Sequence, residues 1–121
     1  MLVGLIHPAA VVSRYASVDL GSVIMAGVQV NAGAQIGLGC ILNTGCSVDH
    51  DCQLASAVHI SPGAHLAGSV QVDEESWVGI GACVRQLVRI GRRVVVGAGA
   101  AVVTDVADDV TVVGVPARPF R

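Results

Sequence analysis

The chain has 121 residues, a formal net charge of −2, and one residue each of Phe, Trp and Tyr. This length predicts a single domain without a core built on aromatic side chains. The nearly balanced charge argues against binding to nucleic acid or to an anionic membrane.

From Ile6 onward, aliphatic residues recur at every sixth position. This first series is Ile6, Val12, Val18, Ile24, Val30, Ile36, Leu42, Val48, Leu54, Ile60, Leu66, Val72, Val78, Val84, Ile90, Val96 and Val102. A second series, four residues after each first position, contains only small or β-branched residues: Ala10, Ala16, Ser22, Val28, Ala34, Cys40, Cys46, Cys52, Val58, Ala64, Val70, Ser76, Ala82, Val88, Val94, Ala100 and Val106. Such a pair of series is typical of the hexapeptide repeat of a parallel β-helix. We therefore expect an all-β solenoid of between five and six coils as a single domain over residues 1–121, with coils over about 6–107 and a C-terminal tail over 108–121.

Glycines three residues after a first-series position mark the turns, since glycine takes a positive φ without steric cost. They are Gly21, Gly27, Gly33, Gly39, Gly45, Gly63, Gly81 and Gly99. Ala57, Glu75, Leu87 and Arg93 stand where the pattern calls for glycine, so less regular corners are expected there. Equivalent residues of successive coils are expected about 4.8 Å apart.

The uncharged stretch 20–48 is long enough to suggest a transmembrane helix, but glycine interrupts it at every sixth position and the repeat continues through it. The N-terminus has no basic region typical of a signal peptide, which leads us to expect a cytoplasmic protein. Cys40, Cys46 and Cys52 belong to the second series, so we expect core packing rather than disulfides or a metal site. Cys83 is expected to face outward.

Polar residues gather in the middle of the chain, around His50, which Asp49 and Asp51 flank. A carboxylate beside an imidazole favours its charged form and fixes its tautomer, as a general base requires. Gly68 lies one coil of 18 residues after His50, where it leaves space beside the ring and offers a backbone N–H. Base, space and donor together are the parts of an acyl-transfer site. His59 lies nine residues, or half a coil, from His50, so the two histidines can share a site only between subunits.

The segments Asn43–Cys52, Val58–Ala64, Leu66–Gly68 and Gly114–Ala117 resemble the bacterial sugar O- and N-acetyltransferases of the sialic-acid-O-acetyltransferase type, which include UDP-4-amino-sugar N-acetyltransferases. The resemblance covers essentially the whole chain. It implies a left-handed helix and a homotrimer that binds acetyl-CoA, the acyl donor, in the groove between subunits. The acceptor would be an amine or hydroxyl of a sugar or nucleotide-sugar, acetylated directly without an acyl-enzyme.

The resemblance also assigns roles to residues. His50 would be the general base, polarised by Asp51 with support from Asp49 and Asn43, and the Gly68 N–H would stabilise the oxyanion. His59 would lie near the acetyl group. The other cofactor-binding positions implied are Ile80, Gly81, Gly97, Ala98, Gly114 and Pro116. No metal is expected.

Other functions remain open at this level. Members of this family normally carry an N-terminal nucleotide-sugar domain that this sequence lacks, so a trimmed catalytic domain, a non-sugar acceptor and a non-catalytic scaffold are alternatives. A zinc γ-carbonic anhydrase needs three histidines at one metal, whereas His59 and His65 are expected to face different sides. The cluster Arg85, Arg89, Arg92 and Arg93 could contact coenzyme A phosphates or form a solvated basic face.

Overall fold

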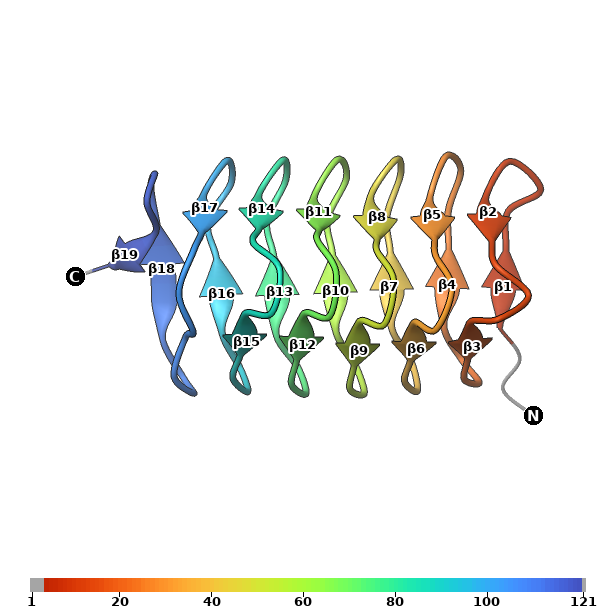
Figure 1. Cartoon of the computed structure of the whole chain (residues 1–121), viewed down its shortest axis with the longest axis horizontal. Coiled ribbons are helices and arrows are strands. Elements are labelled where there is room, and N and C mark those ends of the chain that lie inside the picture. Colours follow the sequence, from red (N-terminus) through yellow and green to blue (C-terminus); the bar gives the residue numbers. More distant parts are fainter. Residues whose placement is uncertain (1–3, 121) are drawn as a thin grey trace.

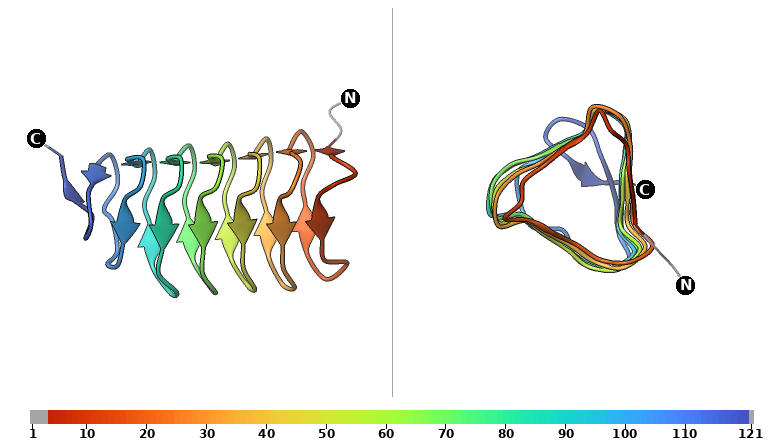
Figure 2. Two further views of the ribbon diagram at one scale, coloured as in Figure 1. Left: turned by 90° about the horizontal axis from the view of Figure 1, so that it is seen from above. Right: turned by 90° about the vertical axis from the view of Figure 1, so that its right-hand side faces the viewer.

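The computed structural model describes residues 4–120, which wind into a left-handed parallel β-helix with a triangular cross-section (Figures 1 and 2). This confirms the predicted fold class. The described residues contain no helix, so none of them forms a helical membrane span.

Three sheets form the faces of the prism. Sheet A consists of β1 (Leu5–Ile6), β4 (Val23–Ile24), β7 (Ile41–Leu42), β10 (His59–Ile60), β13 (Trp77–Val78), β16 (Val95–Val96), β18 (Thr111–Val113) and β19 (Arg118–Pro119). Sheet B consists of β2 (Val11–Val12), β5 (Gln29–Val30), β8 (Ser47–Val48), β11 (His65–Leu66), β14 (Cys83–Val84) and β17 (Ala101–Val102). Sheet C consists of β3 (Ser17–Val18), β6 (Gln35–Ile36), β9 (Gln53–Leu54), β12 (Gln71–Val72) and β15 (Arg89–Ile90).

The two residues of each short strand point in opposite directions, and this places the first series in the core. Ile60, for example, pairs with Leu42 and Val78, each 18 residues away, and is fully buried. First-series residues from Ile24 to Val102 are at most 3% exposed. Ile6 is 50% exposed because no coil of the described chain covers it from below. Burial of each large aliphatic side chain contributes about 1.5–3 kcal/mol, so the stack is stabilised coil by coil.

The second series also faces inward, including its polar members. Ser22 is completely buried, donates to the Gly37 carbonyl at 2.8 Å and accepts from the Cys40 N–H at 3.0 Å. Cys40, Cys46 and Cys52 are fully buried free thiols, as predicted, and burial raises the pKa of Cys46 to about 12. Cys83 is exposed, also as predicted.

The corners are more uniform than the sequence suggested. Ala57, Glu75, Leu87 and Arg93 have φ between 51° and 66°, the same left-handed conformation as the turn glycines. The expectation of less regular corners at these positions was therefore wrong. The cross-strand ladder imposes the turn geometry, and the non-glycine residues carry its steric cost.

The last coil is two residues shorter than the others. Partners on earlier coils are 18 apart, but Ile90 bridges Val106 and Val96 pairs with Val112, each 16 apart. Val106 therefore occupies a first-series position, and its assignment to the second series was wrong. The parallel ladder continues through β18, beyond the end at about residue 107 that the repeat indicated, before β19 turns back antiparallel.

Candidate active site

The corner between sheets B and C carries His50 in the turn between β8 and β9. We call this edge of the prism, formed by residues 13–15, 31–33, 49–51, 67–69 and 85–87, the B/C corner. The His50 side chain is 60% exposed, and its Nδ1 lies 3.2 Å from Oδ2 of Asp51. Asp51 takes a left-handed conformation with φ of 59°. A carboxylate on Nδ1 leaves Nε2 as the atom of the ring available to a substrate.

The second flanking carboxylate supports the turn and not the ring. Oδ1 of Asp49 accepts from the His50 backbone N–H at 2.7 Å and from Nδ2 of Asn31 at 2.8 Å. The hydrogen bond from Asn31, and then the one from the His50 N–H, hold the pKa of Asp49 below its ordinary value. Asp49 and Asp51 therefore have different functions in this turn, one ordering the backbone and the other facing the imidazole.

Glycines lie next to both members of the His50–Asp51 pair. A Cβ at Gly68, one coil above, would overlap Nε2 and Cε1 of the imidazole. A Cβ at Gly33, one coil below Asp51, would overlap the carboxylate of Asp51. The Gly68 N–H donates to no backbone carbonyl in residues 4–120. At this corner the imidazole therefore packs against a glycine whose N–H has no backbone acceptor among residues 4–120.

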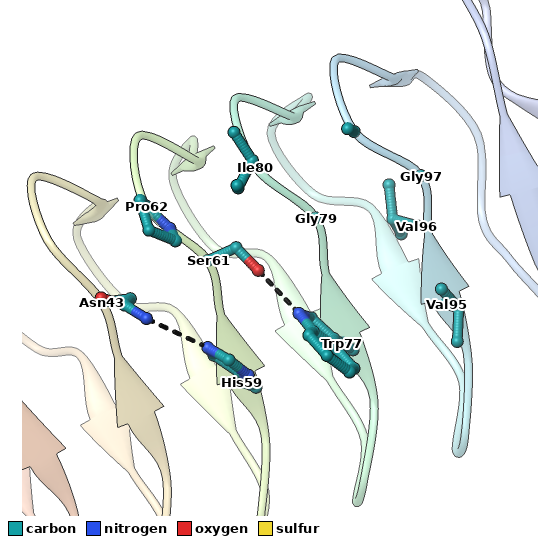
Figure 3. A pocket seen from close by; sticks show the side chains of 11 residues that line it. Asn43, His59, Ser61, Pro62, Trp77, Gly79, Ile80, Val95, Val96 and Gly97 are labelled. Carbon is teal, nitrogen blue, oxygen red and sulfur yellow. Dashed lines mark hydrogen bonds between the residues drawn. The ribbon is translucent and has the colours of Figure 1, made fainter.

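A second cluster lies on the outer surface of sheet A, centred on His59. The imidazole stacks on Trp77 with ring centroids 4.9 Å apart and an interplanar angle of 18°. Nε2 of His59 lies 3.5 Å from Nδ2 of Asn43, and Nε1 of Trp77 donates to Oγ of Ser61 at 2.6 Å (Figure 3). Burial lowers the pKa of His59, which favours the neutral ring.

These residues line a mainly apolar groove of about 540 Å³ that runs across four coils (Figure 3). Asn43 and His59 lie at one end, and Val95, Gly97 and Ala98 lie at the other. Elsewhere on the outer face of sheet A, Leu5 and Ile41 are also exposed apolar residues. Sheet A therefore presents a largely apolar outer face next to the groove.

The residues predicted to form one site fall in three places of the single chain. His50, Asp49, Asp51 and Gly68 share the B/C corner, while Asn43 and His59 lie together on sheet A. Ile80, Gly97 and Ala98 line the groove with His59. Gly81 lies in the neighbouring turn, with φ of 65°, and Gly114 and Pro116 lie in the loop between β18 and β19. The chain alone does not bring Asn43 to His50.

Four residues that contact the predicted site were not singled out from the sequence. Asn31 lies 18 residues before Asp49, Gly33 lies 18 before Asp51, and Trp77 lies 18 after His59. Ser61 lies 16 residues before Trp77. The coil period applied to each candidate residue was the signal that could have identified the first three.

Three members of the arginine cluster form ion pairs. Arg89 contacts Asp73 at 2.8 Å, Arg92 contacts Asp108 at 3.7 Å, and Arg93 pairs with Asp109. Arg85 has no carboxylate partner within the described residues. The sequence left two interpretations of this cluster, contacts with coenzyme A phosphates or a solvated basic face. The ion pairs of Arg89, Arg92 and Arg93 fit the solvated face. Residues 4–120 contain no group of three or more His, Cys, Asp or Glu side chains placed to hold a metal ion.

This chain is similar in sequence and in fold to several known acetyltransferases. No family model matches the chain. It is 41% identical over 59 residues to a galactoside O-acetyltransferase of Lactococcus lactis, a match that covers 49% of this chain and 28% of the relative. Among solved structures, the acetyltransferase domain of PglB from Neisseria gonorrhoeae, also solved with acetyl coenzyme A, has 51% identity and a TM-score of 0.98.

A second solved relative is the GDP-perosamine N-acetyltransferase of Caulobacter crescentus, with 45% identity and a TM-score of 0.97. The chain is covered over 98% and 99% of its length by these two structures, and it spans 58% and 57% of their chains. The likeness thus extends over the whole β-helix and over little more than half of each relative. In sequence and fold, this chain is similar to the β-helical part of sugar acetyltransferases of the hexapeptide-repeat type.

Proposed function

We propose that the chain transfers the acetyl group of acetyl-CoA to an amine or hydroxyl of a sugar or nucleotide-sugar. The observation that carries the proposal is the geometry around His50. The Asp51 carboxylate lies beside Nδ1 of His50, and the His50 ring packs against Gly68. Solved relatives that contain acetyl-CoA, or CoA with GDP-perosamine, support the donor and the class of acceptor. Of the two acceptor groups, the amine is favoured by the perosamine N-acetyltransferase, a solved relative whose match covers 99% of this chain.

In this chemistry His50 relays one proton from the acceptor to the leaving sulfur, and no covalent enzyme intermediate forms. Nε2 of His50 accepts a proton from the acceptor amine as its nitrogen bonds to the thioester carbonyl carbon. The negative charge that develops on the carbonyl oxygen is stabilised by the Gly68 N–H, a donor that no backbone carbonyl of residues 4–120 engages. Collapse of the tetrahedral species breaks the C–S bond, and the imidazolium returns its proton to the sulfur of coenzyme A.

The donor occupies the groove on sheet A, and a homotrimer completes the site. The groove is mainly apolar, which suits the pantetheine arm of coenzyme A, and it holds His59, Ile80, Gly97 and Ala98. Because His50 and His59 are on different sides of the prism, the B/C corner of one subunit faces sheet A of the next. Gly81, Gly114 and Pro116 border the coenzyme at the same interface. Each of the three sites is then shared by two neighbouring subunits, one contributing the B/C corner and the other the sheet A groove.

The first test is turnover with acetyl-CoA and GDP-perosamine or a UDP-4-amino-4,6-dideoxy sugar, measured as release of free thiol and as the mass of the product. His50→Ala should lower kcat by about 10²–10⁴-fold, the usual contribution of a positioned base. His65→Ala, which changes an exposed histidine on sheet B, is the matched control and should retain activity. Unchanged turnover of His50→Ala would refute the assignment of the base. Failure of the unaltered chain to bind acetyl-CoA would favour the non-catalytic scaffold.

A further inference from the structure

The B/C corner carries a cation as well as the candidate base. Arg14 is the only Lys or Arg in the first 84 residues. It lies in the turn between β2 and β3, 36 residues before His50 and therefore two coils below it in the same column of the solenoid. With strands about 4.8 Å apart, the two backbones are separated by roughly 10 Å along the axis.

The guanidinium of Arg14 is exposed and free to bind an anion. Its Cζ lies 5.1 Å from the centroid of the Tyr15 ring, a cation–π contact within its own turn. No carboxylate pairs with it among residues 4–120, in contrast to Arg89, Arg92 and Arg93. Tyr15 therefore orients the arginine without neutralising it.

No bulky side chain stands between Arg14 and His50 in their column, and the Asp51 carboxylate lies to one side of it, over Gly33. The one residue between them in this column is Ala32, which presents only a methyl group. Along one side of the path, Asn31 and Asp49 are hydrogen-bonded to each other at 2.8 Å, so their polar groups are already engaged. A small molecule can therefore lie along the corner from the imidazole to the guanidinium.

The direction of the path follows from Gly68. This proposed oxyanion donor lies one coil to the C-terminal side of His50, which assigns that side to the thioester. The acceptor then lies on the N-terminal side, toward Arg14. A hexose with its amine at His50 and an anomeric phosphate at the other end of its ring spans such a distance.

We infer that Arg14, oriented by Tyr15, binds the diphosphate of a nucleoside diphosphate-amino sugar whose amine is acetylated at His50. The planar guanidinium can donate two parallel hydrogen bonds to a phosphate, which a Lys ammonium cannot do. This inference rests on the proposed function and makes its acceptor specific. It selects a nucleotide-linked sugar over a free amino sugar.

The kinetic test compares two acceptors that share the amine, GDP-perosamine and free 4-amino-4,6-dideoxymannose. Arg14→Ala should raise KM for GDP-perosamine at least about 10-fold and leave KM for acetyl-CoA and the turnover of the free sugar unchanged. Arg14→Lys should recover part of the loss. Arg92→Ala, an exposed arginine outside the B/C corner, is the control. An unchanged KM for GDP-perosamine, or an equal loss with both acceptors, would overturn the inference.

A binding measurement separates this inference from the proposed reaction. Calorimetric titration with GDP and with UDP requires no turnover, and the unaltered chain should bind at least one of them. Arg14→Ala should weaken that binding at least about 10-fold, and higher salt should weaken it in the unaltered chain only. No binding by the unaltered chain, or equal binding by the two proteins, would refute the arginine anchor even if acetylation is observed.

Discussion

At the scale of single residues, the candidate site depends on two glycines, Gly33 and Gly68, that have no side chain. His50 and Asp51 are long polar side chains held against the surface of the prism, and each lies over a glycine of an adjacent coil. Stacked equivalent residues are separated by only about 4.8 Å, so a side chain that folds along the corner needs an empty neighbour. The two glycines are therefore part of the geometry of the base, although neither contributes a functional group.

Gly68→Ala tests this dependence. The added methyl would overlap the His50 ring, so the imidazole must leave its position against Gly68. We expect kcat to fall by about 10²-fold or more, because base and oxyanion donor are displaced together. Stability should change little, since Gly68 is not at a positive φ. Gly4→Ala is the matched control, because its Cβ would lie at an ordinary contact distance of 3.5 Å from the Ser22 carbonyl oxygen. Full activity of Gly68→Ala would show that the ring does not need this position.

His59 should make stability depend on pH in a defined direction. Burial lowers its pKa in the folded chain, so below the ordinary imidazole value of about 6.5 the unfolded chain binds a proton more readily than the folded one. Stability should therefore fall as the pH drops below about 6.5, until the folded form is also protonated. His59→Gln removes this titration. Urea unfolding between pH 7.5 and 5.5 should show the stability advantage of the unaltered chain shrinking as the pH falls, whereas parallel curves would contradict this.

At the scale of the coil, the structure follows the two aliphatic series closely. It departs from them at Val106, because valine occurs in both series and its type alone does not say to which series it belongs. The series predicted which face of each strand is buried from Ile24 to Val102, because a large and a small inward residue per hexad specify the register. Val106 satisfied the second series by its type but belongs to the first. Oδ1 of Asp105 accepts from the Arg89 N–H at 2.9 Å, and this side chain replaces a backbone carbonyl of the ladder where the coil is shortened. A local hydrogen bond of this kind leaves no periodic signal.

The site was predictable to the same extent. Residues 18 apart are neighbours, so the proximity of Gly68 to His50 followed from the period alone. The stacking of Trp77 on His59 follows the same rule. The pairing of Asn43 with His59 joins a turn to a strand of the next coil, and that contact depends on side-chain rotamers that no period encodes.

The left-handed corners carry a testable strain. Leu87 has φ of 66° and a 76% exposed side chain, so it bears the cost of the left-handed conformation with little burial in return. That cost is roughly 1–2 kcal/mol for a residue with a Cβ, and glycine loses about 0.5–1 kcal/mol through its larger unfolded entropy. Leu87→Gly should therefore raise the free energy of unfolding by about 0.5–1 kcal/mol. Leu38→Gly, at an exposed leucine without positive φ, should lower it. A loss of stability in both variants would show that the Leu87 side chain has a stabilising contact.

At the scale of the whole molecule, one chain holds the two halves of the proposed site on different sides of a rigid prism. The stacked coils leave no hinge between the B/C corner and sheet A, so no movement within the chain can bring His50 and His59 together. The apolar outer face of sheet A and the groove beside it are what an adjoining subunit would cover. A ring of three identical head-to-tail interfaces gives each subunit one complete site with its neighbour.

Mixing two inactive variants tests this arrangement directly. If each site takes His50 from one subunit and His59 from the next, His50→Ala and His59→Ala trimers are both impaired. Three-quarters of the trimers formed after random co-refolding in equal amounts contain both variants, and each of these has one intact site in three. The mixture should therefore recover about one quarter of the unaltered activity, against almost none for either variant refolded alone. If both histidines act within one chain, every chain in the mixture lacks one of them and no activity returns. Light scattering on the same samples measures the mass of the assembly, and a monomer would exclude the shared site independently of any assay.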